Sequence, residues 1–334
     1  MGAFHSVSRM LRGTLACMVL VLLLGSGVAH AQGVANRLPA MTKIKALSVP
    51  YFALEFIAAE RDFFKKYNLD VEFVTQVAQG TAGIPAILAG HVQTGQGYGA
   101  STILQSRAGG ANIVAVYAGI TSTYGDFRFY TLADSGIKSA KGLIGKTFGI
   151  SNFGTYADIA LLAYLAKESV DVSQLKRLSV PLPSMCQALL ARQIDVVAMY
   201  SLFYIPCEKE NPGKVVMLAK DSDAIAPAAK LYSSYVFTED YMRDNPGVVR
   251  AYVAALREAA DFVNKNGETA KQIIAKRTGL PADRLFVPTF AKDGCFDMGA
   301  AADWVKVMET HNAIKPGSVT PTGWVTNRFN DACK

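Results

Sequence analysis

Short apolar runs alternate with amphipathic stretches along the chain, and the same order of elements occurs twice. In the first occurrence, strands and helices alternate over residues 44–49, 53–67, 71–77, 81–89 and 91–95. In the second, they alternate over residues 146–150, 155–167, 175–180, 184–192 and 194–198. This spacing is typical of parallel sheets built from right-handed crossovers. The pattern predicts two α/β lobes, each with a parallel sheet.

The two occurrences are copies of one unit. Residues 86–98 (AILAGHVQTGQGY) align without gaps on residues 188–200 (ALLARQIDVVAMY), an offset of 102 positions. At the same offset, residues 45–51 fall on residues 147–153. Several segments that share one offset indicate a duplication, with one copy in each lobe. Ligands of such sheets bind beyond the carboxyl ends of the strands, where helices begin.

Outside the copies, the pattern predicts how the lobes are connected. Residues 127–132 and 235–238 are short strand-like runs, and we interpret them as two strands that cross between the lobes. Residues 240–265 and 268–277 are expected to be long helices that pack back on the first lobe. The predicted lobe I is therefore discontinuous, over residues 32–128 and 238–334, and lobe II covers residues 129–237.

The N-terminus has the features of a secretory signal peptide. Arg9 and Arg12 precede an apolar run over residues 15–24, and Ala29-His30-Ala31 follows it. The run is shorter than the roughly 20 apolar residues that a spanning helix needs. We predict a signal peptide over residues 1–31, cleavage after Ala31, and a soluble periplasmic protein.

Charge and cysteine content narrow the classes of partner. Removal of Arg9 and Arg12 lowers the formal net charge from +7 to +5, and the remaining charges are interspersed, which argues against nucleic-acid binding. Cys17 leaves with the signal peptide. The four remaining cysteines suggest disulfides, for which three connectivities are possible. Sequence proximity favours the pairs Cys186–Cys207 and Cys295–Cys333. No metal-binding spacing is present, and we expect neither a metal nor a cofactor.

Four motifs carry a resemblance to a known family. They are AILAGHV at 86–92, GLIGKTFGIS at 142–151, ALLARQID at 188–195, and FTEDYM at 237–242 followed by Asn245-Pro246. In this order they resemble the sulfonate/nitrate/taurine-type periplasmic binding proteins, a broad family that includes thiamine-precursor-synthase-like domains. The resemblance implies a type II periplasmic-binding-protein fold, a hinge of two crossing strands, and delivery of a ligand to an inner-membrane ABC permease.

The loops between strands and helices supply the candidate ligand residues. Hydroxyl side chains at helix starts suit oxyanion ligands, although capping alone explains any one of them. Aromatic side chains in or beside the same loops can cover an apolar or aromatic body. The repeat places Tyr98 and Tyr200 at equivalent positions, from which we expect them to face one cleft. The predicted ligand-binding set is Tyr51, Phe52, Thr81, Tyr98, Ser101, Ser151, Asn152, Phe153, Thr155, Ser184 and Tyr200.

Other residues near these loops are expected to have structural roles. Core packing accounts for Phe203 and Tyr204. Arg128 is expected to be paired in the hinge, and Glu55 to be solvated or to cap its helix. No Lys or Arg lies in the loops themselves, so the predicted ligand is modest in charge.

These observations predict a monomeric solute-binding protein of an ABC importer that binds a small organic anion of sulfonate or carboxylate type. We do not expect an enzyme, because no Gly-x-Ser-x-Gly elbow is present and the processed chain has only His91 and His311 as histidine bases. The alternatives are a pyrimidine or thiamine-precursor binding protein, and a synthase-like enzyme on the same fold. The synthase would need clustered cysteines, and those of this chain are scattered.

Overall fold

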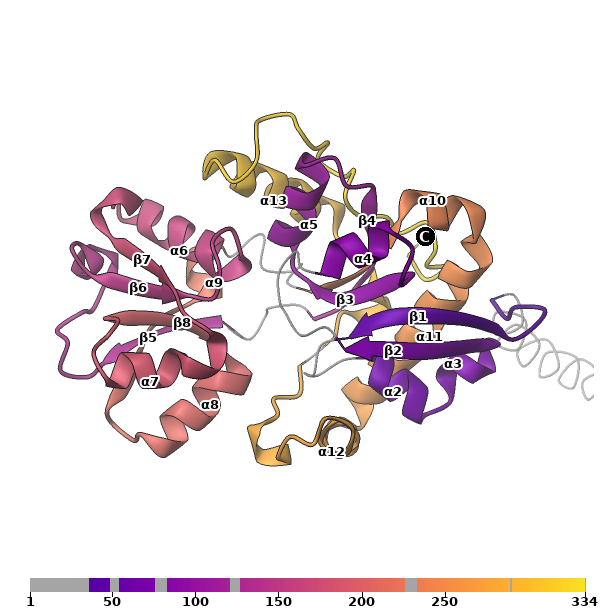
Figure 1. The fold of residues 1–334 in the computed structure, drawn as a ribbon, viewed down its shortest axis with the longest axis horizontal. Coiled ribbons are helices and arrows are strands. Elements are labelled where there is room, and N and C mark those ends of the chain that lie inside the picture. The colour runs from indigo at the N-terminus through magenta and orange to yellow at the C-terminus, as the bar shows by residue number, and fades with distance from the viewer. Residues whose placement is uncertain are drawn as a thin grey trace, which may run out of the picture.

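The computed structural model describes residues 36–48, 54–75, 83–120, 127–225, 233–288 and 290–333. They form two α/β lobes, each built on one five-stranded sheet (Figure 1). Among these residues, no helix is long and apolar enough to cross a membrane. The predicted signal peptide lies outside the described ranges.

The two sheets have the same strand order. The first consists of β1 (Thr42–Ser48), β2 (Leu69–Thr75), β3 (Thr94–Tyr98), β4 (Ile113–Ala118) and β10 (Ser234–Thr238), in the order β2-β1-β3-β10-β4. The second consists of β5 (Phe127–Leu132), β6 (Thr147–Ile150), β7 (Lys176–Ser179), β8 (Val196–Tyr200) and β9 (Val215–Lys220), in the order β7-β6-β8-β5-β9. β3 and β8, and likewise β4 and β9, lie 102 positions apart. The structure therefore confirms the duplication.

The sheets are mixed, which corrects the prediction of purely parallel sheets. β10 pairs antiparallel with β3 and β4, and β5 pairs antiparallel with β8 and β9. The two runs interpreted as crossing strands are thus interior strands of the sheets. Each enters its sheet after the chain has changed lobes and runs opposite to its neighbours. Next to the changes of lobe, Gly119 N donates to Ser233 O at 2.9 Å, and Ser233 N donates to Ile120 O at 3.3 Å. The exact lobe boundaries stay a prediction, because residues 121–126 and 226–232 lie outside the description.

Helices cover both faces of each sheet. The α-helices are α2 (Leu54–Glu60), α3 (Phe63–Lys66), α4 (Ile84–Leu88), α5 (Ala100–Ala108), α6 (Tyr156–Lys167), α7 (Met185–Leu190), α8 (Ser201–Glu210), α9 (Asp221–Ala224), α10 (Glu239–Asp244), α11 (Pro246–Lys265), α12 (Gly267–Thr278) and α13 (Met298–Thr310). The 3-10 turns are η2 (Ala140–Leu143), η3 (Val172–Gln174), η4 (Leu182–Ser184), η6 (Ala282–Arg284) and η7 (Lys292–Gly294).

Two helices that the pattern predicted as continuous are divided. The helix expected over residues 53–67 ends at Glu60, and α3 begins after Asp62, whose φ of 56° is left-handed and breaks the helical path. The helix expected over residues 240–265 is divided at Asn245. Pro246 begins α11, a position where its missing N–H costs no helical hydrogen bond.

The core of the first lobe has two layers. On one face of the sheet, α2 and α3 pack with α11, which buries Val249, Tyr252 and Leu256 at helical spacing. On the other face, α4, α5 and α13 belong to a second hydrophobic cluster that continues into the second lobe. Because α5 and α13 lie in this shared layer, they bring first-lobe side chains to the contact between the lobes (Figure 1).

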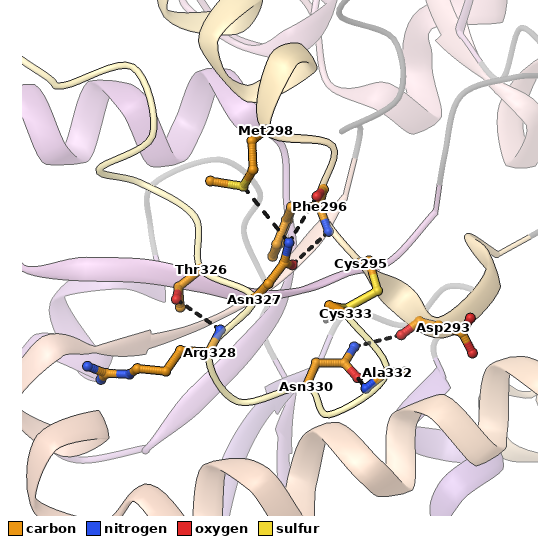
Figure 2. Close-up of a disulfide and its surroundings, with 10 residues drawn as sticks. All are labelled: Asp293, Cys295, Phe296, Met298, Thr326, Asn327, Arg328, Asn330, Ala332 and Cys333. Atoms are coloured by element: carbon orange, nitrogen blue, oxygen red, sulfur yellow. Dashed lines mark hydrogen bonds between the residues drawn. A yellow bond between two sulfur atoms is a disulfide. The ribbon is translucent and has the colours of Figure 1, made fainter.

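Both disulfides join the cysteines that sequence proximity favoured. Cys186 of α7 bonds to Cys207 of α8. Cys295 bonds to Cys333, which fastens the C-terminal tail beside η7, where Asn330 Nδ2 donates to Asp293 O at 2.6 Å (Figure 2). The tail also pairs with the edge strand β4, since Ala115 N donates to Trp324 O at 2.9 Å. The tail thereby covers part of an open sheet edge.

Candidate functional site at the contact between the lobes

The lobes meet where α5 of the first faces the start of α6 in the second. Gln105 Nε2 donates to Gly154 O at 2.7 Å. Gly154 has a φ of +72°, and a Cβ at this position would lie 2.6 Å from Gln105 Nε2. Only glycine is free of strain here, because it has no Cβ and adopts positive φ readily. The predicted ligand loop of lobe II therefore reaches the first lobe through its backbone.

Ser101 lies on the face of α5 that points to this contact. It precedes Gln105 by four residues, so the two side chains occupy one side of the helix. Ser101 is fully buried, and its Oγ has no hydrogen-bond partner. The N-cap residue of α5 is Gly99, which has no side chain to cap the first-turn N–H groups. Among the described residues, the start of α5 thus combines a buried hydroxyl that has no partner with backbone N–H groups that no side chain caps.

The start of α6 is similarly without a side-chain cap. The Thr155 hydroxyl donates to Asn152 O at 2.8 Å and makes no capping hydrogen bond. The start of α6 therefore presents the positive end of its dipole beside α5 of the other lobe, which it contacts through Gly154 and Gln105. This arrangement can hold an anion between the lobes by hydrogen bonds from backbone and hydroxyl groups.

A buried ion pair holds the loop before α6 in place. Arg177 Nη1 of β7 donates to Asp158 Oδ1 at 2.7 Å, and Gly154 N donates to Asp158 Oδ2 at 2.8 Å. The Arg177 guanidinium also lies 5.2 Å from the centre of the Phe153 ring. The loop sequences themselves contain no Lys or Arg. Arg177 comes from the neighbouring strand β7 and reaches the loop only in the folded protein.

The aromatic candidates differ in their surroundings. Tyr98 and Tyr200 are both buried in the hydrophobic core, which is not what loop-tip side chains in an open cleft would show. Tyr200 lies 5.4 Å from Phe127 and 4.9 Å from Phe203, between ring centres. Phe153 is 57% exposed. Whether Tyr98 and Tyr200 contact a ligand remains a prediction.

The remaining candidates are spread over lobe II or lie outside the description. Ser151 is half-buried, Asn152 is exposed, and Ser184 is exposed beside a groove of about 370 Å³ between β7 and α7, away from α5. Tyr51, Phe52 and Thr81 fall outside the described residues. The structure thus places Gly154, between Phe153 and Thr155, against Gln105 of α5, one helical turn from Ser101, and places Ser184 beside a groove lined by residues of lobe II.

The structure pairs Arg128 within lobe II, where its guanidinium lies 4.2 Å over the Tyr204 ring and Nη1 donates to Tyr130 Oη at 3.3 Å. Tyr204 is buried, as core packing predicted.

Glu55 is fully buried, so the expectation of a solvated side chain was wrong. It faces the sheet and α11, and Tyr235 Oη donates to its Oε2 at 2.7 Å. Burial raises the pKa of the Glu55 carboxyl to about 8. The same Tyr235 Oη accepts a hydrogen bond from Leu54 N at 3.1 Å, which ties the start of α2 to β10.

Trp304 of α13 is a further residue that sequence inspection missed. Its ring centre lies 5.7 Å from that of Tyr156, the first residue of α6, so it spans the contact between the lobes. No local pattern distinguishes it, because α13 lies outside both copies of the repeat.

Comparisons with known proteins agree with this architecture. Residues 49–270 match the family described as NMT1/THI5 like. A protein of Brucella abortus (strain 2308), named as a binding protein without a stated ligand, is 27% identical over 286 residues, which cover 85% of this chain and 84% of the relative.

Solved structures share the fold at low sequence identity. The alkanesulfonate-binding protein SsuA from Xanthomonas axonopodis pv. citri, bound to MOPS, has a TM-score of 0.71 and 15% identity, covering 86% of this chain and 99% of SsuA. The periplasmic nitrate-binding protein NrtA from Synechocystis PCC 6803 has a TM-score of 0.69 and 12% identity, covering 87% of each chain. The desulfurization enzyme DSZB is also similar, with a TM-score of 0.64 and 13% identity, covering 87% of this chain and 98% of DSZB. The fold alone therefore does not separate binding from catalysis.

Proposed function

The chain belongs to the NMT1/THI5-like family, and on that premise we propose that it is a periplasmic solute-binding protein that delivers a small organic anion to an ABC importer. The anion is of sulfonate or carboxylate type and binds between the lobes. Family membership agrees with the resemblance that the four sequence motifs indicated.

One observation carries the proposal of an anion. Ser101 Oγ is buried and has no hydrogen-bond partner, at a helix start that no side chain caps. A buried hydroxyl without a partner costs about 1–3 kcal/mol, which a ligand oxygen would recover. The same helix contacts the start of α6 through Gln105 and Gly154, so an oxyanion bound between the two helices would contact both lobes and favour their closure.

Two features support binding rather than catalysis. A serine nucleophile needs a base within hydrogen-bond reach, and Ser101 Oγ has no hydrogen-bond partner among the described residues. The four cysteines within the described ranges form two disulfides, so none of them supplies a thiolate.

The test is calorimetric titration and thermal melting of ligand-free protein with methanesulfonate, nitrate, benzoate, benzenesulfonate and a neutral aminopyrimidine. A ligand that binds only the folded state raises apparent stability by about 2.7 kcal/mol at a hundredfold excess over Kd. We expect at least one anion to do so and the neutral pyrimidine not to. Binding of the pyrimidine alone would favour the thiamine-precursor alternative.

The variant Ser101→Ala tests whether Ser101 belongs to the anion-binding site. It should weaken anion binding about tenfold, the effect of one lost hydrogen bond to a charged group, and leave the ligand-free melting temperature unchanged or higher. Ser106→Ala on the same helix is the matched control, because the Ser106 hydroxyl already donates to Thr102 O at 2.8 Å. Equal loss of affinity in both variants would remove Ser101 from the site.

A further inference from the structure

The two tryptophans of the chain differ in one respect. Both are fully buried. Trp324 Nε1 donates to Ala301 O at 3.2 Å, whereas Trp304 Nε1 has no acceptor. An indole N–H can only donate, and leaving a buried donor unpaired is unfavourable. None of the described residues supplies an acceptor for the Trp304 indole.

The place of Trp304 suggests where that acceptor comes from. α13 packs against α5, whose first turn carries Ser101, and the Trp304 ring lies beside Tyr156 at the start of α6. The Tyr156 hydroxyl donates to Asp221 Oδ2 at 2.9 Å, so this tyrosine is anchored within lobe II. Among the described residues, two donors without partners, Ser101 Oγ and Trp304 Nε1, thus lie on adjacent helices of one lobe, and both helices contact the start of α6 in the other.

We propose that Trp304 is a specificity-determining residue whose Nε1–H donates to an oxygen of the bound oxyanion. The inference rests on the proposed function and deepens it. Because the indole group can only donate, the ligand atom that meets it must be a hydrogen-bond acceptor. A hydrogen bond to an ionised oxygen is stronger than one to a neutral oxygen, so the site should prefer a fully ionised acid to the corresponding amide. The Tyr156 ring beside the indole makes this preference depend on contact between the lobes.

NMR of the two tryptophan indole N–H groups tests the contact between Trp304 and the ligand directly. Uniformly ¹⁵N-labelled protein has two indole N–H signals, one for each tryptophan, and Trp304→Phe or Trp324→Phe assigns them by loss of one. Saturation with methanesulfonate or benzoate should move the Trp304 indole proton downfield as its hydrogen bond forms. The Trp324 signal, whose donor is already paired, should stay in place. Methanesulfonamide and benzamide are the neutral comparison probes and should leave both signals unchanged.

Affinity gives the second measurement. Trp304→Phe keeps an aromatic ring against Tyr156 but removes the donor, and it should raise the Kd of the anion at least tenfold. Trp324→Phe is the matched control and should change Kd less than twofold. If Trp304→Phe does not fold, the wild-type signals assigned with Trp324→Phe decide the question alone.

The outcomes separate the two claims. If an anion binds by calorimetry while the Trp304 signal does not move, or while Trp304→Phe binds normally, the role of Trp304 is wrong and the proposed function stands. If the amides bind as tightly as the acids, the specificity is wrong. If none of the anions binds the wild-type protein, the proposed function fails and the inference fails with it.

Discussion

Equivalent positions in the two lobes hold different pairs of side chains. In lobe II, Asp158 of α6 and Arg177 of β7 form an ion pair at 2.7 Å. Arg177 pairs with Phe148 in the sheet of lobe II. Ala46 lies 102 positions before Phe148 and pairs with Phe73, so Phe73 holds the sheet position of Arg177 in lobe I. The counterpart of Asp158 at the same offset is Phe56.

Lobe I therefore has an aromatic pair where lobe II has an ion pair. The rings of Phe56 and Phe73 meet edge to face with their centres 5.4 Å apart, and the Arg277 guanidinium of α12 lies 5.3 Å from each. The described part of lobe II has no helix equivalent to α12, and its ion pair instead holds the loop that contacts α5 through Gly154. One position of the fold thus serves packing in lobe I and loop placement in lobe II.

A second contrast concerns the first turn of the same helices. Glu55 in α2 corresponds to Ala157 in α6. Among the described residues, Tyr235 donates to Oε2 of the Glu55 carboxyl, and Oε1 has no hydrogen-bond partner. Burial without a cation raises the pKa of Glu55, so the acid is largely neutral at pH 7.

The largest predicted effect is the pH dependence that Glu55 confers. Its pKa rises from 4.5 to about 8 on folding, so the folded state retains a proton that the unfolded state loses. Stability should fall as pH rises from about 4.5 to 8, by about 4–5 kcal/mol in all, and then level off. Glu55→Gln should remove this fall and be the more stable protein at pH 8, as urea unfolding at several pH values would show. Glu60→Gln, exposed on the same helix, is the control; a matching change there would contradict the assignment.

Removal of either disulfide should have the next largest effect. The bonds span 21 residues in lobe II and 38 residues around the tail of lobe I. Loop-closure entropy predicts a loss of about 3–4 kcal/mol for each double Cys→Ser variant. Hydrogen exchange should distinguish them. Loss of Cys295–Cys333 should expose the amides of Ala115 and Thr326, which pair β4 with the tail, while loss of Cys186–Cys207 should leave them protected. Equal protection in both variants would contradict a local role for the tail bond.

Loss of the ion pair between Arg177 and Asp158 should have the third-largest effect on the free energy of unfolding. Arg177→Met leaves the buried Asp158 carboxylate without its cation, at a cost of about 3 kcal/mol in unfolding free energy. Arg107→Met in lobe I breaks a bridge of similar length, 2.8 Å, to Glu239, whose side chain is 49% exposed. That control should cost less than about 1 kcal/mol. If the two variants lost similar amounts of unfolding free energy, burial of the acidic partner would not determine the cost of breaking the ion pair.

Features of short range and fixed period could be predicted from the sequence alone. Hydrophobic periodicity revealed the alternation of strands and helices, because it reports which face of each element is buried. The 102-residue offset revealed the duplication, and proximity indicated both disulfide pairs. Four motifs indicated the family. The hydroxyl of Ser101 was selected because helix starts favour such residues.

Only the tertiary structure decided which residues meet across long separations. The antiparallel direction of β5 and β10 depends on the end from which the chain enters each sheet. The pattern of α2 does not reveal that Glu55 is buried, because α11 covers it from nearly 200 residues away in the chain. Arg177 reaches its loop from a neighbouring strand, and Trp304 reaches α6 from the other lobe. Local periodicity records burial but not the partner, since the partner is set by how strands and lobes are joined in space.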